Sequence, residues 1–252
     1  MKAMIFAAGK GTRLQPITNT IPKGLVTIGG KTMLEQVIGK LTGAGVTQIV
    51  VNVHHHAGKM KQFIKQLNYP GVQIHVSDEE DALLDTGGGL IHAREWLQGE
   101  APFFIYNVDV LCDIDLKALQ AVHQQHGCLA TLAVAARKTS RYLLVDDHHL
   151  LAGWMNINTG EKILCRPQQN NNLRQMAFSG IHLVSPEIFE LIDTTGSFAI
   201  LPEYLRLARH HNICCMEHDP AFWADIGTPD KLEAARRLFN NNPDRFLPNQ
   251  TP

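Results

Sequence analysis

Short apolar runs alternate with longer amphipathic segments through the first half of the chain. Apolar residues at helical spacing predict helices over residues 32–44, 56–67, 89–96 and 115–125. Continuous apolar runs predict buried strands over residues 3–7, 48–53, 72–76, 102–108 and 129–135. This alternation predicts an α/β fold with a mostly parallel, twisted sheet and helices on both of its faces.

The pattern changes after about residue 137, where polar turns separate short strand-like segments. These segments cover residues 142–145, 150–156, 162–165 and 178–183. They predict a small antiparallel insertion that could act as a lid over a site. Residues 168–172 are expected to form an exposed loop.

The last part of the chain predicts helices over residues 186–192 and 201–210 and a strand over residues 222–225. Thr228 is expected to cap a final helix, with Pro229 in its first turn and its end at about Phe239. The tail that follows is predicted to be loosely held. Because the sequence shows neither a repeat nor a clear linker, we expect a single domain over residues 1–252. Its approximate parts are a core over 1–136, an insertion over 137–225 and a C-terminal helix and tail over 226–252.

Composition and charge narrow the class of protein. With 44% hydrophobic residues, 19% charged residues and a net charge of −1, the chain is typical of a soluble protein without a nucleic-acid or membrane partner. The five cysteines show neither a CxxC motif nor zinc spacing, so unpaired thiols in a reducing cytoplasm are expected. Neither a signal sequence nor a membrane span is predicted, which again favours a cytoplasmic protein.

Candidate chemistry begins in residues 7–23, AAGKGTRLQPITNTIPK, directly after the first predicted strand. Gly9 and Gly11 allow backbone N–H groups to approach a ligand, and Arg13 and Lys23 indicate that this ligand is an anion. A loop of this kind at the carboxyl end of a strand predicts a phosphate or nucleotide site. A plain structural turn would explain the glycines alone, but it needs no pair of nearby cations.

Two known phosphate-binding patterns do not fit this loop. A dinucleotide fingerprint has a third glycine where this chain has Leu14, and it needs an acidic residue after the second strand, which ends at residues 52–54 without one. An NAD-binding domain is therefore disfavoured. The P-loop pattern also fails, because no GK[ST] step follows at the required spacing.

Two aspartates are candidate ligands of a divalent cation. Asp109 follows the buried strand pattern FFIYNV, and Asp225 follows an apolar step and precedes the last predicted helix. Carboxylates at strand ends suit a Mg²⁺ ion that bridges phosphates. The alternative is a turn or a helix cap, although Asp113 and Asp115 are better placed for that role.

A second glycine run, Leu84-Asp85-Thr86-Gly87-Gly88-Gly89, lies before a predicted helix. It could let the backbone approach a flat or phosphorylated ligand, with a flexible loop as the alternative. The triplet at residues 54–56 and the pair at residues 148–149 are interpreted as loop histidines, because consecutive side chains do not converge on one ion. The sequence shows no convincing Ser/His/Asp or Cys/His arrangement.

Together, these motifs resemble a known family. The string AAGKGTRLQPIT…IPKGLVTIGGKTMLEQ resembles the signature of the sugar-1-phosphate nucleotidyltransferases, roughly GxGTRLxPLT…PKxLxxVxGKP. The resemblance covers nearly the whole chain. Within the family, the chain looks closest to the N-acetylmuramate 1-phosphate uridylyltransferases, through residues 49–55, 84–89, 178–181 and 223–229.

The resemblance implies a Rossmann-like nucleotidyltransferase fold with a small antiparallel sugar-binding insertion. It implies that an NTP and a sugar 1-phosphate, the expected small-molecule partners, react to give an NDP-sugar and pyrophosphate with Mg²⁺ as cofactor. Arg13 and Lys23 would be the catalytic cations, with Arg13 on the departing pyrophosphate. The remaining roles are carried over by motif position. Ser179 and Gly180 would bind the sugar phosphate, and Asp109 and Asp225 would hold the metal. The nucleotide would be bound by Ala8, Gly9, Gly11, Thr12, Thr86 and Gly87.

Some residues depart from the family pattern, namely Gly24, Thr32 and Val108, but none of these changes removes a charged group. Base and sugar therefore stay open. A hexose 1-phosphate transferase that uses GTP, dTTP, UTP or ATP on mannose or glucose 1-phosphate is one alternative. A transferase-like regulatory module with a dead site is another, although all four charged site residues are present. The oligomeric state and the number of metal ions are not predicted.

Overall fold

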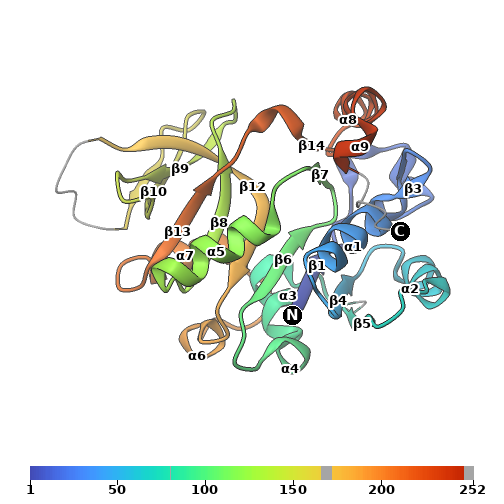
Figure 1. Ribbon diagram of the computed structural model, residues 1–252, viewed down its shortest axis with the longest axis horizontal. Coiled ribbons are helices and arrows are strands. Elements are labelled where there is room, and N and C mark those ends of the chain that lie inside the picture. Colours follow the sequence, from blue (N-terminus) through green and yellow to red (C-terminus); the bar gives the residue numbers. More distant parts are fainter. Residues whose placement is uncertain (80, 166–171, 247–252) are drawn as a thin grey trace.

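The computed structural model describes residues 1–79, 81–165 and 172–246 and consists of one large sheet flanked by helices (Figure 1). The sheet has ten strands, with a main order of β11-β10-β9-β12-β6-β1-β4-β5 and with β8 between β12 and β13. The strands are β1 (Lys2–Phe6), β4 (Gln48–Val53), β5 (Gln73–Asp78), β6 (Phe103–Asn107), β8 (Ala130–Ala135), β9 (Arg141–Val145), β10 (Leu151–Asn156), β11 (Lys162–Leu164), β12 (Arg174–Val184) and β13 (Ile213–Glu217).

The sheet is parallel in its first part and mostly antiparallel beyond it, apart from the parallel pair of β8 and β13. β1 pairs in parallel with both β4 and β6, and β4 pairs in parallel with β5. The long strand β12 runs antiparallel to β6, β8 and β9, and β9, β10 and β11 continue antiparallel to one another. The predicted α/β fold with a mostly parallel core and a small antiparallel part is confirmed.

Helices cover both faces of the sheet because alternate strand residues point to opposite faces. On β1, Ala3 and Ile5 belong to one hydrophobic cluster, whereas Met4 belongs to the other. The first cluster packs under α1 (Met33–Gly43), α2 (Ala57–Gln66) and α5 (Leu116–His126). The second packs under α3 (Asp85–His92), α4 (Arg94–Leu97), α6 (Ile188–Leu191) and α7 (Ile200–Leu207).

Local signals explain where several of these helices begin. The Thr32 side chain accepts a hydrogen bond from the Glu35 backbone at the start of α1, and the Glu35 carboxylate accepts one from the Thr32 backbone in return. Asp115 caps α5 through the backbone N–H groups of Lys117 and Ala118. This agrees with the expectation that Asp115 is a capping residue.

Small elements surround the carboxyl end of the sheet. Two short ladders lie there, β2 (Thr27–Ile28) with β3 (Lys31–Thr32), and β7 (Val110–Cys112) with β14 (Trp223–Asp225). The helix α8 (Pro229–Asn241) follows, with Thr228 as its cap. The expectation of a loose tail is wrong up to Phe246, because α9 (Pro243–Phe246) packs Phe246 on Phe239 with ring centroids 5.9 Å apart. Of the loop expected over 168–172, residues 168–171 lie outside the described residues.

The expectation of five unpaired thiols is also wrong. Cys128 and Cys214 form a disulfide with their Cα atoms 6.0 Å apart, while Cys112 and Cys215 are buried thiols. The pair meets because β13, a strand that the pattern did not predict, lies beside β8. No helix within the described ranges is long and apolar enough to cross a bilayer.

Two buried histidines make the stability of the folded core depend on pH. His182 on β12 is fully buried against the Tyr204 hydroxyl, 2.7 Å away, and burial lowers its pKa to about 3. His123 on α5 lies 3.0 Å from the hydroxyls of both Thr131 and Ser185, and burial lowers its pKa to about 4. An unfolded histidine titrates near 6.5, so below that pH the unfolded chain binds protons that the folded chain does not.

We therefore expect the free energy of unfolding to fall as the pH drops through about 6.5, with a slope for each histidine that rises toward about 1.4 kcal/mol per pH unit as the unfolded chain becomes fully protonated. Urea unfolding at several pH values between about 7 and 5 measures this slope. His182→Gln should remove its share of the slope, and the exposed His126→Gln is the matched control that should leave the slope unchanged. A wild-type slope in His182→Gln would contradict this assignment.

Candidate active site

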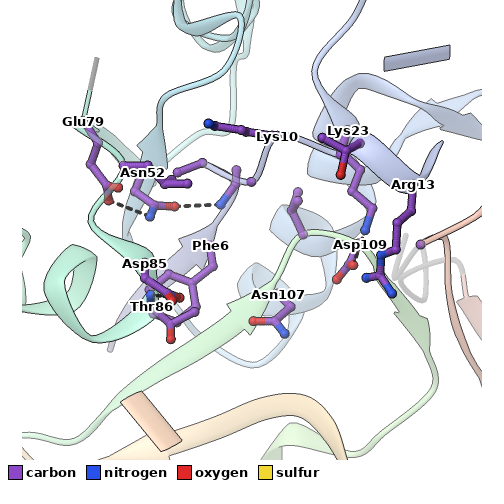
Figure 2. Close-up of a pocket in the computed structure, with 18 of the residues that line it drawn as sticks. Phe6, Lys10, Arg13, Lys23, Asn52, Glu79, Asp85, Thr86, Asn107 and Asp109 are labelled. Carbon is purple, nitrogen blue, oxygen red and sulfur yellow. Dashed lines mark hydrogen bonds and ion pairs between the residues drawn. The ribbon is translucent and has the colours of Figure 1, made fainter. Parts of the chain in front are cut away.

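A cavity of about 520 Å³ opens at the carboxyl ends of β1, β4 and β6. Figure 2 shows charged side chains from the segments that follow these strands and from neighbouring segments around one space. In open α/β sheets, ligands bind at this edge. The residues that line the cavity are Phe6, Ala7, Ala8, Gly9, Lys10, Gly11, Thr12, Arg13, Lys23, Asn52, Glu79, Leu83, Asp85, Thr86, Asn107, Val108, Asp109, Ser197 and Gly227.

The glycine loop forms one wall of this cavity. Gly11 has a φ of +64°, a conformation that suits glycine, and its carbonyl accepts hydrogen bonds from the Thr18 hydroxyl and the Leu14 backbone at 2.8 Å each. A Cβ atom added to Gly9 would meet no other atom within 4 Å, so the loop backbone faces open space there. All five loop residues expected to bind nucleotide lie at the cavity, namely Ala8, Gly9, Gly11, Thr12 and Arg13.

Lys23 and Asp109, which both line the cavity, form an ion pair at one end of it (Figure 2). Their side chains are 13% and 25% exposed, so the pair is partly shielded from water. Arg13 extends toward the same place from the glycine loop (Figure 2). Three segments of the chain therefore bring two cations and one carboxylate together, an arrangement that suits a polyphosphate and its counter-ion.

Asp225 adjoins this group through the backbone. Ile226 donates to the Asp109 carbonyl at 3.0 Å, and the Asp225 carboxylate accepts from the Gly227 backbone at 2.9 Å and from Lys231 at 2.6 Å. Gly227 lines the cavity, whereas Asp225 itself lies just behind the lining.

Two carboxylates supply too few ligands to hold a divalent cation without help from a bound molecule. Over the described ranges, no group of three or more His, Cys, Asp or Glu side chains could form a complete metal site. Mg²⁺ often binds through one or two carboxylates and completes its shell with water and substrate phosphates. Asp109 and Asp225 therefore fit a magnesium ion that is shared with a bound polyphosphate.

A buried polar relay forms the opposite end of the cavity. The Ala7 backbone donates to Asn52 Oδ1 at 2.7 Å, and Asn52 Nδ2 donates to Glu79 Oε1 at 2.8 Å. Glu79 Oε2 then accepts from the Leu84 backbone at 3.2 Å. Sequence reasoning missed Asn52 and Glu79, although a polar residue inside the apolar run QIVVNV was a usable signal.

Asn52→Ala is expected to lower the free energy of unfolding by about 2–4 kcal/mol, because it leaves the buried Glu79 carboxylate and the Ala7 N–H short of a partner. Nucleotide affinity should fall as well, since the relay joins two segments of the cavity wall. Urea unfolding and calorimetric NTP binding measure the two effects. Asn68→Ala, at an exposed position, is the control. A loss of less than about 0.5 kcal/mol in Asn52→Ala would contradict the role of the relay.

The second glycine run packs closely against another segment. Gly87 donates to the Phe198 carbonyl at 2.8 Å, and a Cβ atom on Gly87 would lie 2.2 Å from the Phe198 ring. The Thr86 hydroxyl accepts from the Ile200 backbone at 3.0 Å. Thr86 reaches the cavity, while Gly87 lies outside its lining. Because Gly87 has no side chain, the segment of Phe198 can pack against it, and the neighbouring Ser197 reaches the cavity, as Thr86 does.

Ser179 and Gly180 lie behind the cavity wall. Ser179 is fully buried, and its hydroxyl lies 2.7 Å from His218 Nε2, while the Trp223 indole donates to its carbonyl at 2.9 Å. Burial lowers the pKa of His218, so a neutral ring accepts from the Ser179 hydroxyl. Gly180 has a φ of +77°, and an added Cβ atom would lie 2.9 Å from Asn107 Nδ2, at the cavity.

The histidine triplet holds loops together. The His54 ring lies 2.8 Å from the Glu79 carbonyl, and the rings of His55 and His56 lie 3.4 and 3.2 Å from the Thr18 carbonyl. These contacts support the interpretation of loop histidines. They also connect α2 to the segment that follows the glycine loop.

The chain is similar to known proteins over nearly its whole length. Residues 2–242 match the family model described as nucleotidyl transferase. An N-acetylmuramate alpha-1-phosphate uridylyltransferase from Caulobacter vibrioides is 32% identical over 248 residues, covering 94% of this chain and 96% of that protein. A mannose-1-phosphate guanyltransferase from Kluyveromyces lactis is 31% identical over 245 residues, covering 96% of this chain and 65% of that protein.

Solved structures show the same fold. A UDP-glucose pyrophosphorylase from Acinetobacter baumanii superposes with a TM-score of 0.78 at 17% identity. The superposition covers 97% of this chain and 95% of that structure.

Proposed function

The chain belongs to the nucleotidyl transferase family, and we propose that it transfers a uridylyl group from UTP to N-acetylmuramate 1-phosphate. The products would be the UDP-sugar and pyrophosphate. The full-length similarity to the Caulobacter vibrioides uridylyltransferase supports this choice of substrates. One observation carries the reaction type, namely that Arg13, Lys23 and Asp109 meet at a single cavity.

In this reaction, a phosphate oxygen of the sugar 1-phosphate attacks the α-phosphorus in line with the departing pyrophosphate. The obstacle is repulsion between anions, so positioning and electrostatics account for most of the catalysis. We assign Arg13 to the pyrophosphate and Lys23 to the α-phosphate. The attacking phosphate is already ionised near neutral pH, so no general base is needed.

We assign the other site roles by position in the family motif. Asp109 and Asp225 would hold Mg²⁺, which when bound supplies positive charge that offsets the charge on the phosphates. Ala8, Gly9, Gly11 and Thr12 would follow the nucleotide, with Thr86 and Gly87 on the base side. For the sugar phosphate we retain Ser179 and Gly180, with backbone groups as the donors because the Ser179 hydroxyl is bonded to His218.

Guanylyl transfer to mannose 1-phosphate is the second candidate, supported by the similarity to the Kluyveromyces lactis guanyltransferase. Both reactions place the same demands on Arg13, Lys23 and the two aspartates. Their difference lies in the base pocket and in the sugar pocket. The cytoplasm stays the proposed compartment, because cells keep their nucleoside triphosphates there.

The test is a pyrophosphate-release screen of UTP, GTP, dTTP, ATP and CTP against several sugar 1-phosphates, including those of N-acetylmuramate, mannose and glucose. We expect the largest kcat/KM with UTP and N-acetylmuramate 1-phosphate. A larger value for GTP with mannose 1-phosphate would overturn the substrate choice and leave the reaction type standing. Absence of release with every pair would favour a dead, regulatory module.

A further inference from the structure

Arg137 lies two residues after the end of β8, in the part of the chain assigned to the sugar. Its Nη2 donates to the Phe178 carbonyl on β12 at 2.6 Å. Its guanidinium carbon lies 3.8 Å from the centroid of the Trp223 ring. The stacking on Trp223 fixes the plane of the guanidinium, and the hydrogen bond to Phe178 fixes the direction of one of its edges.

One further donor of this guanidinium has no acceptor in the part of the chain that the structure describes. Nε of Arg137 is buried and has no hydrogen-bond partner among the described residues. Burial lowers the pKa of Arg137, while the charge of Asp225 acts in the opposite direction. A buried cationic donor without an acceptor is costly, and arginine carries more N–H donors than any other side chain. An arginine with a purely structural role would be expected to have more of its donors paired.

Arg137 contacts a residue next to those assigned to the sugar phosphate. Its partner Phe178 directly precedes Ser179 and Gly180, and Gly180 abuts Asn107 at the cavity. Trp223, on which the guanidinium stacks, lies two residues before Asp225 on β14. Arg137 therefore contacts β12, which carries the residues assigned to the sugar phosphate, and β14, which carries an aspartate assigned to the metal.

We propose that Arg137 binds an oxyanion of the sugar substrate. This proposal rests on the proposed function, because the sugar 1-phosphate supplies the oxyanion. A planar guanidinium that is held by stacking presents paired donors, which match the geometry of phosphate and carboxylate groups. The oxyanion can be the 1-phosphate, which every candidate sugar carries, or the lactyl carboxylate, which N-acetylmuramate adds.

Direct binding tests this role without relying on turnover. Calorimetry measures Kd for N-acetylmuramate 1-phosphate and N-acetylglucosamine 1-phosphate, each with wild type, Arg137→Gln, Arg137→Lys and the exposed control Arg141→Gln. In Arg137→Gln, we expect Kd for the sugar phosphate to rise on the order of 10- to 100-fold, the range for a hydrogen bond to a charged group. Kd for UTP should stay within about twofold in every variant, which also shows that each is folded. Arg137→Lys should fall between wild type and Arg137→Gln.

The two sugars distinguish the two oxyanions. An equal loss for both sugars assigns the 1-phosphate, and a loss for N-acetylmuramate 1-phosphate alone assigns the carboxylate; either result supports the proposal. Unchanged binding of both sugars in Arg137→Gln would overturn it, as would an equal loss of UTP binding. If wild type catalyses the reaction and Arg137→Gln binds sugar normally, this inference fails while the proposed function stands. If wild type binds sugar through Arg137 but releases no pyrophosphate, the proposed function fails while this inference stands.

Discussion

Asp109→Asn is expected to lower kcat about a thousandfold, because the amide keeps the shape of the carboxylate but loses the charge that would hold Mg²⁺ at the phosphates. Metal charge at a transferring phosphoryl group is worth several kcal/mol of transition-state stabilisation, and each 1.4 kcal/mol is about tenfold in rate. The measurement is kcat with saturating substrates over a Mg²⁺ titration. Direct Mn²⁺ binding in the presence of UTP supplies a readout that does not depend on turnover.

Asp115→Asn is the matched control for this variant. Asp115 caps α5 away from the cavity lining, and asparagine also caps helices well, so both kcat and stability should be close to wild type. The unfolding transition of Asp109→Asn should also stay cooperative, since the change affects one partly exposed ion pair. Near wild-type kcat together with unchanged Mn²⁺ binding would contradict the metal role of Asp109.

Lys23→Met is expected to lower kcat by at least about a hundredfold, the typical effect of removing one preorganised electrostatic stabiliser. The Lys23 ammonium contacts Asp109 at the cavity wall, where it can stabilise charge that builds up on the α-phosphate. Because this charge is greatest in the transition state, kcat should fall by a larger factor than KM rises. Steady-state kinetics with each substrate varied in turn measures the two factors separately.

Lys31→Met controls for the loss of a lysine charge. Lys31 is exposed in the small β2–β3 ladder and lies outside the cavity lining, so its loss should leave both constants near wild type. If Lys23→Met instead raises KM and leaves kcat unchanged, Lys23 contributes to binding alone, and the electrostatic part of the mechanism is wrong.

The glycine loop could be predicted because its information is local. A strand, two glycines and Arg13 follow one another within a dozen residues, and the structure places them at one wall in that order. The helix caps at Asp115 and Thr228 are local in the same sense, since each side chain bonds to a backbone within its own first turn.

What the sequence alone did not reveal depends on contacts between distant segments. Lys23 and Asp109 are 86 residues apart, and their ion pair exists only because β6 and the glycine loop lie at the same sheet edge. The strand β13 is a short apolar run, and nothing in the sequence marks its parallel pairing with β8. The disulfide between Cys128 and Cys214 was missed because it depends on this pairing.

The sugar side illustrates a second limit. Ser179 was assigned to substrate by motif position, and in the structure its hydroxyl faces His218 and its carbonyl faces Trp223. Arg137 was not identified, because a single arginine after a strand carries no motif. Only its stacking on Trp223 and its buried, unpaired Nε mark it out.

The most direct measurement of nucleotidyl transfer follows the α-phosphate. With α-labelled UTP, N-acetylmuramate 1-phosphate and Mg²⁺, we expect the label to enter the nucleotide sugar and pyrophosphate to stay unlabelled, and omitting the sugar phosphate or the metal should stop the transfer. Label that leaves as UMP at the same rate without the sugar phosphate would contradict the account, because the cavity around Arg13, Lys23 and Asp109 would then serve hydrolysis.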